Sequence, residues 1–317
     1  MKDCSHECES DRELTRRISA LHLQQRLDIE RHHEAQVFGQ GRNFFHPENW
    51  YSLHALIRTL LRLGRVYARG QRNALDLTVR HHDIPIVGLP AAFHQFTILH
   101  LSDLHLDMHP AIAQGLIERL RGVNYHIGVL TGDFRGRTFG PHTAAIEAMA
   151  QLRPHLRAPW YGVLGNHDTI RMVPPLEAMG IRMLLNEAVA LERGGETIYL
   201  AGIDDPHYYK ADNVEQARER IPPEAISILL SHSPEIYRRA SQAGFHVLLC
   251  GHTHGGQICL PGGWAMTYNA QCPRKLCAGA WRYQQMLGYT SVGVGVSLVD
   301  VRFNCRPEIT LHHLQAA

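Results

Sequence analysis

Two histidines one residue apart, His252 and His254, stand in a glycine-rich turn directly after the apolar run 248–250. A neutral imidazole is a common ligand of zinc, iron and manganese. The neighbouring Gly251 and Gly255 allow the sharp backbone turn that converging side chains require. A single His-x-His is a weak signal, because the chain holds 23 histidines. The pair predicts a metal site only if other stretches supply more ligands.

Four further strand-sized apolar runs, 96–101, 126–131, 160–164 and 226–230, also end in polar residues of metal-ligand type. The residues after these runs are Asp103 and His105, Asp133, the trio Asn166, His167 and Asp168, and His232. For any one of them a turn or helix-cap role would be the better explanation. Five such strand ends together favour a metal site, because ligands gather at the carboxyl ends of strands in α/β sheets.

The predicted donor set contains two carboxylates, one amide and four imidazoles: Asp103, His105, Asp133, Asn166, His232, His252 and His254. One catalytic ion normally takes three protein ligands, so this set suffices for two ions if a carboxylate bridges them. Oxygen and nitrogen donors without thiolates favour Mn, Fe or Zn, and the histidines disfavour Ca and Mg. Two ions about 3.5–4 Å apart promote phosphoryl displacement. The predicted reaction is hydrolysis of a phosphoester or a pyrophosphate.

The motifs occur in a familiar order. Asp103-x-His105, Gly132-Asp133, Gly165-Asn166-His167-Asp168, His232 and Gly251-His252-x-His254 resemble the five motifs of the calcineurin-like metallophosphoesterases. A closer resemblance, carried by residues 184–187, 200–205, 255–258 and 302–309, is to the bacterial phosphodiesterases related to YkuE and YaeI. It covers roughly residues 75–314.

The resemblance implies an α/β fold with four layers, α/β/β/α, in which two mixed sheets lie face to face. It implies that Asp103, His105 and His254 hold one metal ion, that Asn166, His232 and His252 hold the other, and that Asp133 bridges them. A hydroxide on the metals would attack phosphorus in line. The implied catalytic group is His167, Asn166 and Asp168. His167 would stabilise the transition state or protonate the leaving oxygen, and a helix-cap role stays open for Asp168.

One position departs from the family pattern. Many members carry an acid three residues after the bridging aspartate, where it orients the catalytic histidine, and this chain has Gly136 there. We therefore expect another group to orient His167.

The strands that position these residues are predicted to alternate with helices, which we expect over 111–121, 143–152 and 234–243. Strands that alternate with helices indicate an α/β domain. We expect this domain to span residues 73–317, after a helical extension over 1–72. The first 40 residues of the extension are expected to form a surface helix or a loosely held arm. Residues 73–90 are expected to form two short strands.

A helix is expected from residue 50 to 72, with one apolar face and a stripe of five arginines: Arg58, Arg62, Arg65, Arg69 and Arg72. The stripe is either a solvated face or a contact with anionic headgroups of a membrane.

Composition restricts the setting. The 317 residues are 44% hydrophobic, enough for a large core, and a net charge of +2 gives no reason to predict a nucleic-acid partner. Seven cysteines, an odd number, and no apolar region after Met1 predict a reducing cytoplasm without structural disulfides. No run reaches the roughly 18 apolar residues of a membrane span. We expect a cytoplasmic protein, with attachment to the inner membrane surface left open.

The functional hypothesis is a phosphohydrolase with two divalent ions, Mn²⁺ first and Fe or Zn as alternatives, that cleaves phosphodiesters. Two alternatives stay open. The first is a pyrophosphatase of the UDP-2,3-diacylglucosamine type acting at the inner membrane, and the second is a catalytically silent scaffold.

Overall fold

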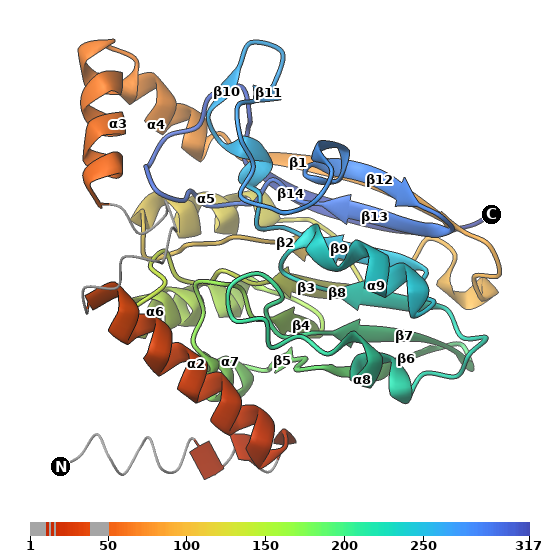
Figure 1. The fold of residues 1–317 in the computed structure, drawn as a ribbon. Helices are drawn as coiled ribbons and strands as arrows, with labels where there is room; N and C mark the ends of the chain where they lie inside the picture. The colour runs from red at the N-terminus through yellow and green to blue at the C-terminus, as the bar shows by residue number, and fades with distance from the viewer. Residues whose placement is uncertain (1–10, 13, 16, 39–50) are drawn as a thin grey trace.

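The computed structural model describes residues 11–12, 14–15, 17–38 and 51–317, and two six-stranded sheets form its centre (Figure 1). The rest of the predicted extension lies outside the described residues. In spatial order the first sheet contains β1 (Thr78–Ile86), β14 (Glu308–Ala316), β2 (Thr97–Leu101), β3 (Ile127–Thr131), β4 (Trp160–Val163) and β5 (Ile181–Met183). The second contains β12 (Gly279–Tyr283), β13 (Met286–Thr290), β9 (Val247–Cys250), β8 (Ser227–Leu230), β7 (Glu196–Gly202) and β6 (Glu187–Arg193).

The strands that precede the predicted ligands run parallel within each sheet. β2, β3, β4 and β5 are parallel neighbours, and so are β7, β8, β9 and β13. Antiparallel pairs occur toward the sheet edges, at β14 with β2, β6 with β7 and β12 with β13. The carboxyl ends of the central strands therefore meet along one edge of each sheet.

Side chains that alternate along each strand pack on the two opposite faces of the sheets. Ile98 and Val129 of the first sheet meet Ile228 and Leu249 of the second in a cluster between the sheets. The neighbouring Leu99, Leu101 and Leu130 face the opposite way, as the two-residue period of a strand requires.

Helices cover both outer faces. α5 (Pro110–Leu120), α6 (Thr143–Leu152) and α7 (Val173–Ala178) pack on the first sheet, and α8 (Val214–Glu219) and α9 (Tyr237–Gln242) on the second. The predicted four-layer α/β/β/α fold is confirmed.

The N-terminal helix α2 (Ala20–Phe38) lies across the helices of the first sheet (Figure 1). Leu23 and Leu27 of this helix, with Leu14 and Ile18 before it, belong to the same buried cluster as α5, α6 and α7. Over the described part of the first 40 residues the chain is therefore a helix packed on the surface of the domain, and not a loosely held arm. The boundary between residues 72 and 73 stays a prediction.

The expected helix over 50–72 is two helices, α3 (Tyr51–Leu63) and α4 (Tyr67–Leu75). The chain breaks at Gly64 and at Arg65, whose φ is 54°. The break lets α4 lie directly on Val301 and Phe303, where a Cβ on Gly70 would come within 2.7 Å of the Phe303 ring. The predicted continuous stripe of arginines is accordingly interrupted.

The two short strands expected over 73–90 are one strand, β1, which includes Pro85 and pairs with β14 in parallel. Its position at the sheet edge tolerates a proline, which donates no ladder hydrogen bond. A small hairpin of β10 (Cys259–Leu260) and β11 (Trp264–Ala265) extends beyond the second sheet (Figure 1). Among the helices that the structure describes, none is long and apolar enough to cross a bilayer.

Candidate metal centre

The predicted donors lie where the central strands of the two sheets end. Asp103 and His105 follow β2, Asp133 follows β3, Asn166 follows β4, His232 follows β8, and His252 and His254 follow β9. Each of these residues is at most 6% exposed. The structure thus brings all seven into one buried region between the sheets.

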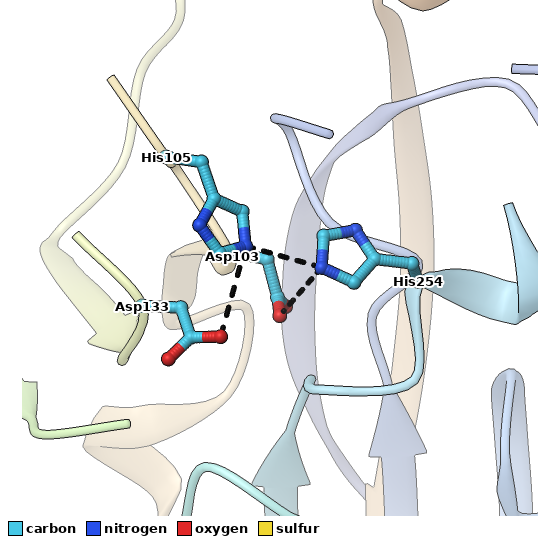
Figure 2. A group of neighbouring side chains, drawn as sticks. All are labelled: Asp103, His105, Asp133 and His254. Atoms are coloured by element: carbon cyan, nitrogen blue, oxygen red, sulfur yellow. Dashed lines mark hydrogen bonds and ion pairs between the residues drawn. The ribbon is translucent and has the colours of Figure 1, made fainter. Parts of the chain in front are cut away.

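One group of donors converges from both sheets (Figure 2). Asp103, His105, Asp133 and His254 each place one ligand atom within 4.8 Å of the others. Nε2 of His105 is 3.1 Å from Nε2 of His254 and 3.6 Å from Oδ2 of Asp133. Nε2 of His254 is also 3.3 Å from Oδ1 of Asp103.

A second group shares Asp133 with the first. Asp133, His232 and His252 also place ligand atoms within 4.8 Å of one another. Nε2 of His232 lies 3.3 Å from Oδ2 of Asp133, 3.1 Å from Nδ1 of His252 and 2.8 Å from Oδ1 of Asn166. Asp133 therefore occupies the position between the groups that a bridging carboxylate needs.

Backbone carbonyls determine which ring nitrogen of three histidines is available as a ligand. Nδ1 of His105 lies 2.7 Å from the carbonyl of Arg135, and Nδ1 of His232 lies 2.7 Å from that of Thr131. Nε2 of His252 lies against the carbonyl of Asn269. Because a carbonyl only accepts, each of these nitrogens carries the proton and the other one faces the donor group.

Burial and neighbouring charge set the protonation of the group. Burial would raise the pKa of Asp133, but His232 and His167 hold it well below its usual range. Burial would lower the pKa of His232, yet Asp133 beside it raises that pKa to about 10. For His254, burial together with His105 and Arg302 holds the pKa well below its usual range. The set therefore gathers a proton beside Asp133, and a divalent cation would displace it.

The donor chemistry fits divalent cations. Lone pairs of buried imidazoles and carboxylates face one another at 3.1–3.6 Å. Such an array is unfavourable unless a cation or a proton lies within it.

Backbone conformation at the donors is unusual. Asp103, His105, Asp133, His252 and His254 have φ values of 51°, 42°, 58°, 73° and 48°. Side chains other than glycine rarely adopt this left-handed region, and such strain concentrates at functional sites. No sequence pattern predicted it.

Two motif glycines are required by close approach. A Cβ on Gly165 would lie 2.2 Å from Oδ1 of Asp133, and one on Gly251 would lie 1.8 Å from Oγ of Ser102. Glycine at these positions lets the turns from both sheets meet at the donor group.

His167 lies at the edge of the donor group, with its Nε2 3.8 Å from Oδ2 of Asp133. Its Nδ1 lies 3.2 Å from Oγ1 of Thr138. Gly136 approaches Met108 so closely that a Cβ there would be 2.2 Å from Cγ of that side chain. In this chain Met108 fills the space beside Gly136, and Thr138 contacts the imidazole of His167.

Asp168 points away from the donors. Its carboxylate accepts hydrogen bonds from the backbone N–H groups of Asp133, Phe134 and Gly165 at 2.8, 3.0 and 2.9 Å. It thereby joins the turn after β3 to the turn after β4. This geometry suits a positioning residue rather than a group that touches substrate.

The sequence analysis assigned no role to two buried arginines: Arg302, which begins the quoted stretch 302–309, and Arg26, which lies outside every motif. Arg302 is fully buried behind His254 and donates to the carbonyls of Val292 and Gly295 at 2.8 and 2.6 Å. Arg26 of α2 donates to the carbonyl of Asp168 at 2.9 Å and pairs with Asp204 at 3.3 Å. Asp204 lies in the quoted stretch 200–205, and its partner on a distant helix could not be inferred from spacing.

Comparison with known proteins places the donor motifs in one family. The family model described as Calcineurin-like phosphoesterase matches residues 96–256. "Uncharacterized metallophosphoesterase YkoQ" of Bacillus subtilis is 30% identical over 257 residues, covering 78% of this chain and 93% of that protein. "Phosphodiesterase YaeI" of Escherichia coli is 26% identical over 240 residues, covering 69% and 82%. The bovine "Transmembrane protein with metallophosphoesterase domain" is 30% identical over 259 residues, covering 74% of this chain and 56% of that protein.

Proposed function

The chain belongs to the calcineurin-like phosphoesterase family of metal-dependent phosphoester hydrolases, and we propose that it is a phosphodiesterase with a dinuclear centre. The observation that carries the proposal is the sharing of Asp133 between two donor groups. Two ions bound there would supply positive charge to the phosphoryl oxygens and lower the pKa of water.

In this proposal the seven donors divide as the two groups do. Asp103, His105 and His254 hold one ion, Asn166, His232 and His252 hold the other, and Asp133 bridges them. Asn166 is supported by the contact of its Oδ1 with His232. A mixed set of oxygen and nitrogen donors without thiolates suits Mn²⁺, Fe or Zn, and Mn²⁺ is the ion proposed first.

His167 is proposed as the group that serves the leaving oxygen. Thr138 holds Nδ1, so Nε2 faces the region beside Asp133 where a phosphoester would lie. An imidazole held in this way can donate a proton to the departing oxygen or stabilise charge on the phosphoryl group. Asp168 contributes by fixing the turns that carry Asp133 and His167.

Diester cleavage is the preferred reaction because YaeI, a relative over 69% of this chain, is named a phosphodiesterase. The test is hydrolysis of bis-p-nitrophenyl phosphate by the Mn-loaded protein, with p-nitrophenyl phosphate as the monoester control. Faster cleavage of the diester supports the proposal. Faster cleavage of the monoester contradicts it.

A second candidate is cleavage of a lipid-linked pyrophosphate such as UDP-2,3-diacylglucosamine at a membrane surface. It is favoured by large apolar side chains that point into solvent at one end of the molecule. Leu56, Leu60 and Leu63 on α3 are 54–76% exposed, and Trp264 and Met266 by the hairpin are 57% and 67% exposed. α3 and the hairpin approach each other there, because Ile57 and Ile258 pack on the same buried cluster.

The arginines around this surface, named in the sequence analysis as a stripe, are partly engaged. Arg62 stacks on Tyr67, Arg69 lies over Phe303, and Arg58 is 3.8 Å from Asp300. Guanidinium groups beside exposed leucines suit an interface with anionic lipid. Flotation with anionic liposomes tests this, and Leu60→Glu with Leu63→Glu should abolish it. If the variant floats like the wild type, the surface does not bind lipid.

The scaffold hypothesis is disfavoured, because every donor position carries a residue capable of binding metal. Absence of turnover on diesters and on the lipid pyrophosphate, with two ions bound per chain, would revive it.

A further inference from the structure

A cavity of about 200 Å³ lies next to the turns that follow β3 and β4. Its wall includes Thr138, whose Oγ1 contacts Nδ1 of His167, while Nε2 of the same ring faces Asp133. Thr169, directly after Asp168, also lines it. Thr138 therefore both lines the cavity and contacts the imidazole of His167.

Three guanidinium groups line the cavity, those of Arg31, Arg135 and Arg171. Arg135 is buried and donates only to backbone carbonyls, those of Thr138 and Gly140 at 2.6 Å and that of His167. Its charge is therefore not neutralised by a direct carboxylate partner among the described residues. The pKa of the adjacent His142 is lowered, first by burial and then by the positive charges of Arg135 and Arg171.

The guanidinium group of Arg171 is only weakly engaged by the described residues around it. Its ion pair with Asp11 is long, at 3.7 Å, and its buried Nε has no hydrogen-bond partner among the described residues. Arg31 is 67% exposed at its side chain and pairs with Asp28 of its own helix. Arg31 also donates from Nε to the carbonyl of Leu27 at 3.3 Å. Neither guanidinium is paired with a buried carboxylate, so both can turn toward a ligand at little cost.

The one carboxylate in the wall, that of Glu30, is already satisfied. It accepts hydrogen bonds from Oγ1 of Thr169 at 2.6 Å and from the N–H of Ile170 at 2.8 Å. It also pairs with buried Arg26 at 3.3 Å. The cavity consequently presents an excess of positive charge.

We infer that this cavity binds a second anionic group of the substrate, linked to the diester phosphorus through the ester group that does not leave. The inference rests on the proposed diesterase function and names its substrate class: diesters that carry a further phosphate, sulfonate or carboxylate. Guanidinium forks recognise such oxyanions through charge-assisted hydrogen bonds. Helix α2 supplies part of the wall through Leu27, Glu30 and Arg31, outside the region 96–256 that the family model matches. The N-terminal helix therefore adds specificity to a catalytic core shared with the family.

The test compares two diesters with the same leaving group, 2-sulfoethyl p-nitrophenyl phosphate and ethyl p-nitrophenyl phosphate, on the Mn-loaded full chain. A sulfonate is a weak ligand for metals. A higher kcat/KM for the sulfoethyl ester would therefore indicate binding by the arginines of the cavity and not by the metal ions. We expect kcat/KM to be about tenfold higher for the sulfoethyl ester. The ratio should fall to about one in Arg31→Gln with Arg171→Gln, and it should persist in Arg282→Gln, a matched change of an exposed arginine on β12. A ratio near one in the wild type, or an unchanged ratio in the double variant, overturns the inference.

A binding measurement separates this inference from the proposed function. Calorimetric titration with ethyl 2-sulfoethyl phosphate and diethyl phosphate should show about tenfold tighter binding of the former, lost in the double variant. If neither p-nitrophenyl ester is hydrolysed but this difference holds, the diesterase proposal fails and the anion site stands. Equal binding of the two phosphates overturns the site whatever the turnover. Should the double variant unfold, Arg31→Gln alone is used, because that side chain is solvent-exposed.

Discussion

Oγ1 of Thr138 lies 3.2 Å from Nδ1 of His167, to which Gly136 offers no side chain. A hydroxyl orients an imidazole without adding negative charge beside it. His167 is thus held by a neutral partner, while Nε2 faces Asp133.

Replacing Thr138 with valine keeps the shape and removes the hydrogen bond. We expect kcat for bis-p-nitrophenyl phosphate to fall about tenfold, as is typical when the partner of an active-site histidine is lost. Metal content, measured by plasma mass spectrometry, should be unchanged because Thr138 contacts none of the donors. Thr138→Ser restores the hydroxyl and should recover most of the rate. A valine variant as fast as the wild type would mean that Thr138 does not orient His167.

Asp133→Asn tests the bridge. The backbone N–H of His167 donates to Oδ1 of Asp133 at 2.9 Å, and an amide oxygen can accept the same bond. The fold should survive, as circular dichroism would show. The variant loses the negative charge shared by the two donor groups, so bound metal should fall from two ions toward one. Turnover should fall about a thousandfold. Two bound ions with near-normal turnover would refute the bridging role.

Gly165→Ala tests the close approach of the turns after β3 and β4. The new Cβ would lie 2.2 Å from Oδ1 and 2.6 Å from the backbone nitrogen of Asp133, and the backbone cannot move aside cheaply. We expect a loss of about 1–3 kcal/mol in the free energy of unfolding and a loss of metal. Gly115→Ala is the control, since a Cβ in this part of α5 meets no atom within 4 Å. It should be neutral or stabilising by up to about 1 kcal/mol.

The strands and the donor side chains that follow them were predictable because the signals are local. Each central strand is a short apolar run, and the residue types that follow it are those that bind metals. The run 248–250 and its two histidines correspond to β9 and the turn after it. Parallel pairing then brings the strand ends together without further information.

Features that depend on distant partners were not predictable. Leu23 and Leu27 of α2 are too few to form a clear apolar face, and buried Arg26 reads as a surface residue until Asp204 is placed beside it. The break between α3 and α4 likewise follows from packing on Val301 and Phe303 rather than from helix propensity. The family resemblance implied that His167 needs an orienting partner but gave no means of finding Thr138.

Arg26 is expected to be the residue on which attachment of α2 depends. Its guanidinium is fully buried, pairs with Asp204 and Glu30 at 3.3 Å and lies 3.3 Å from the ring centre of Tyr209. Arg26→Met leaves the buried carboxylate of Asp204 without its main counter-charge. We expect a loss of about 3–5 kcal/mol in urea-induced unfolding. Adding Asp204→Asn to this variant removes the stranded charge and should recover part of the loss, whereas strictly additive losses would show that the two residues are not coupled.

Buried histidines predict how stability depends on pH. Burial lowers the pKa of His100 to about 3, and its ring contacts Oγ1 of Thr131 and the ring of His312. In the unfolded chain a histidine binds a proton below about pH 6.5. Between pH 6.5 and 3 the unfolded state therefore holds more protons at this position, so stability falls as the pH falls. The contribution of His100 is complete above pH 6.5.

The expected size is about 1.4 kcal/mol per pH unit for this one group, or about 1.4 kcal/mol between pH 7.5 and 5.5. Other groups oppose it: burial and then Asp133 raise the pKa of Asp168 to about 6, which favours the folded state as the pH falls below that value. The measurement is therefore a difference, urea unfolding of the wild type and of His100→Gln at both pH values. The variant should lose about 1.4 kcal/mol less than the wild type on acidification, whatever its stability at pH 7.5. Parallel losses in the two proteins would show that His100 does not stay neutral in the folded state.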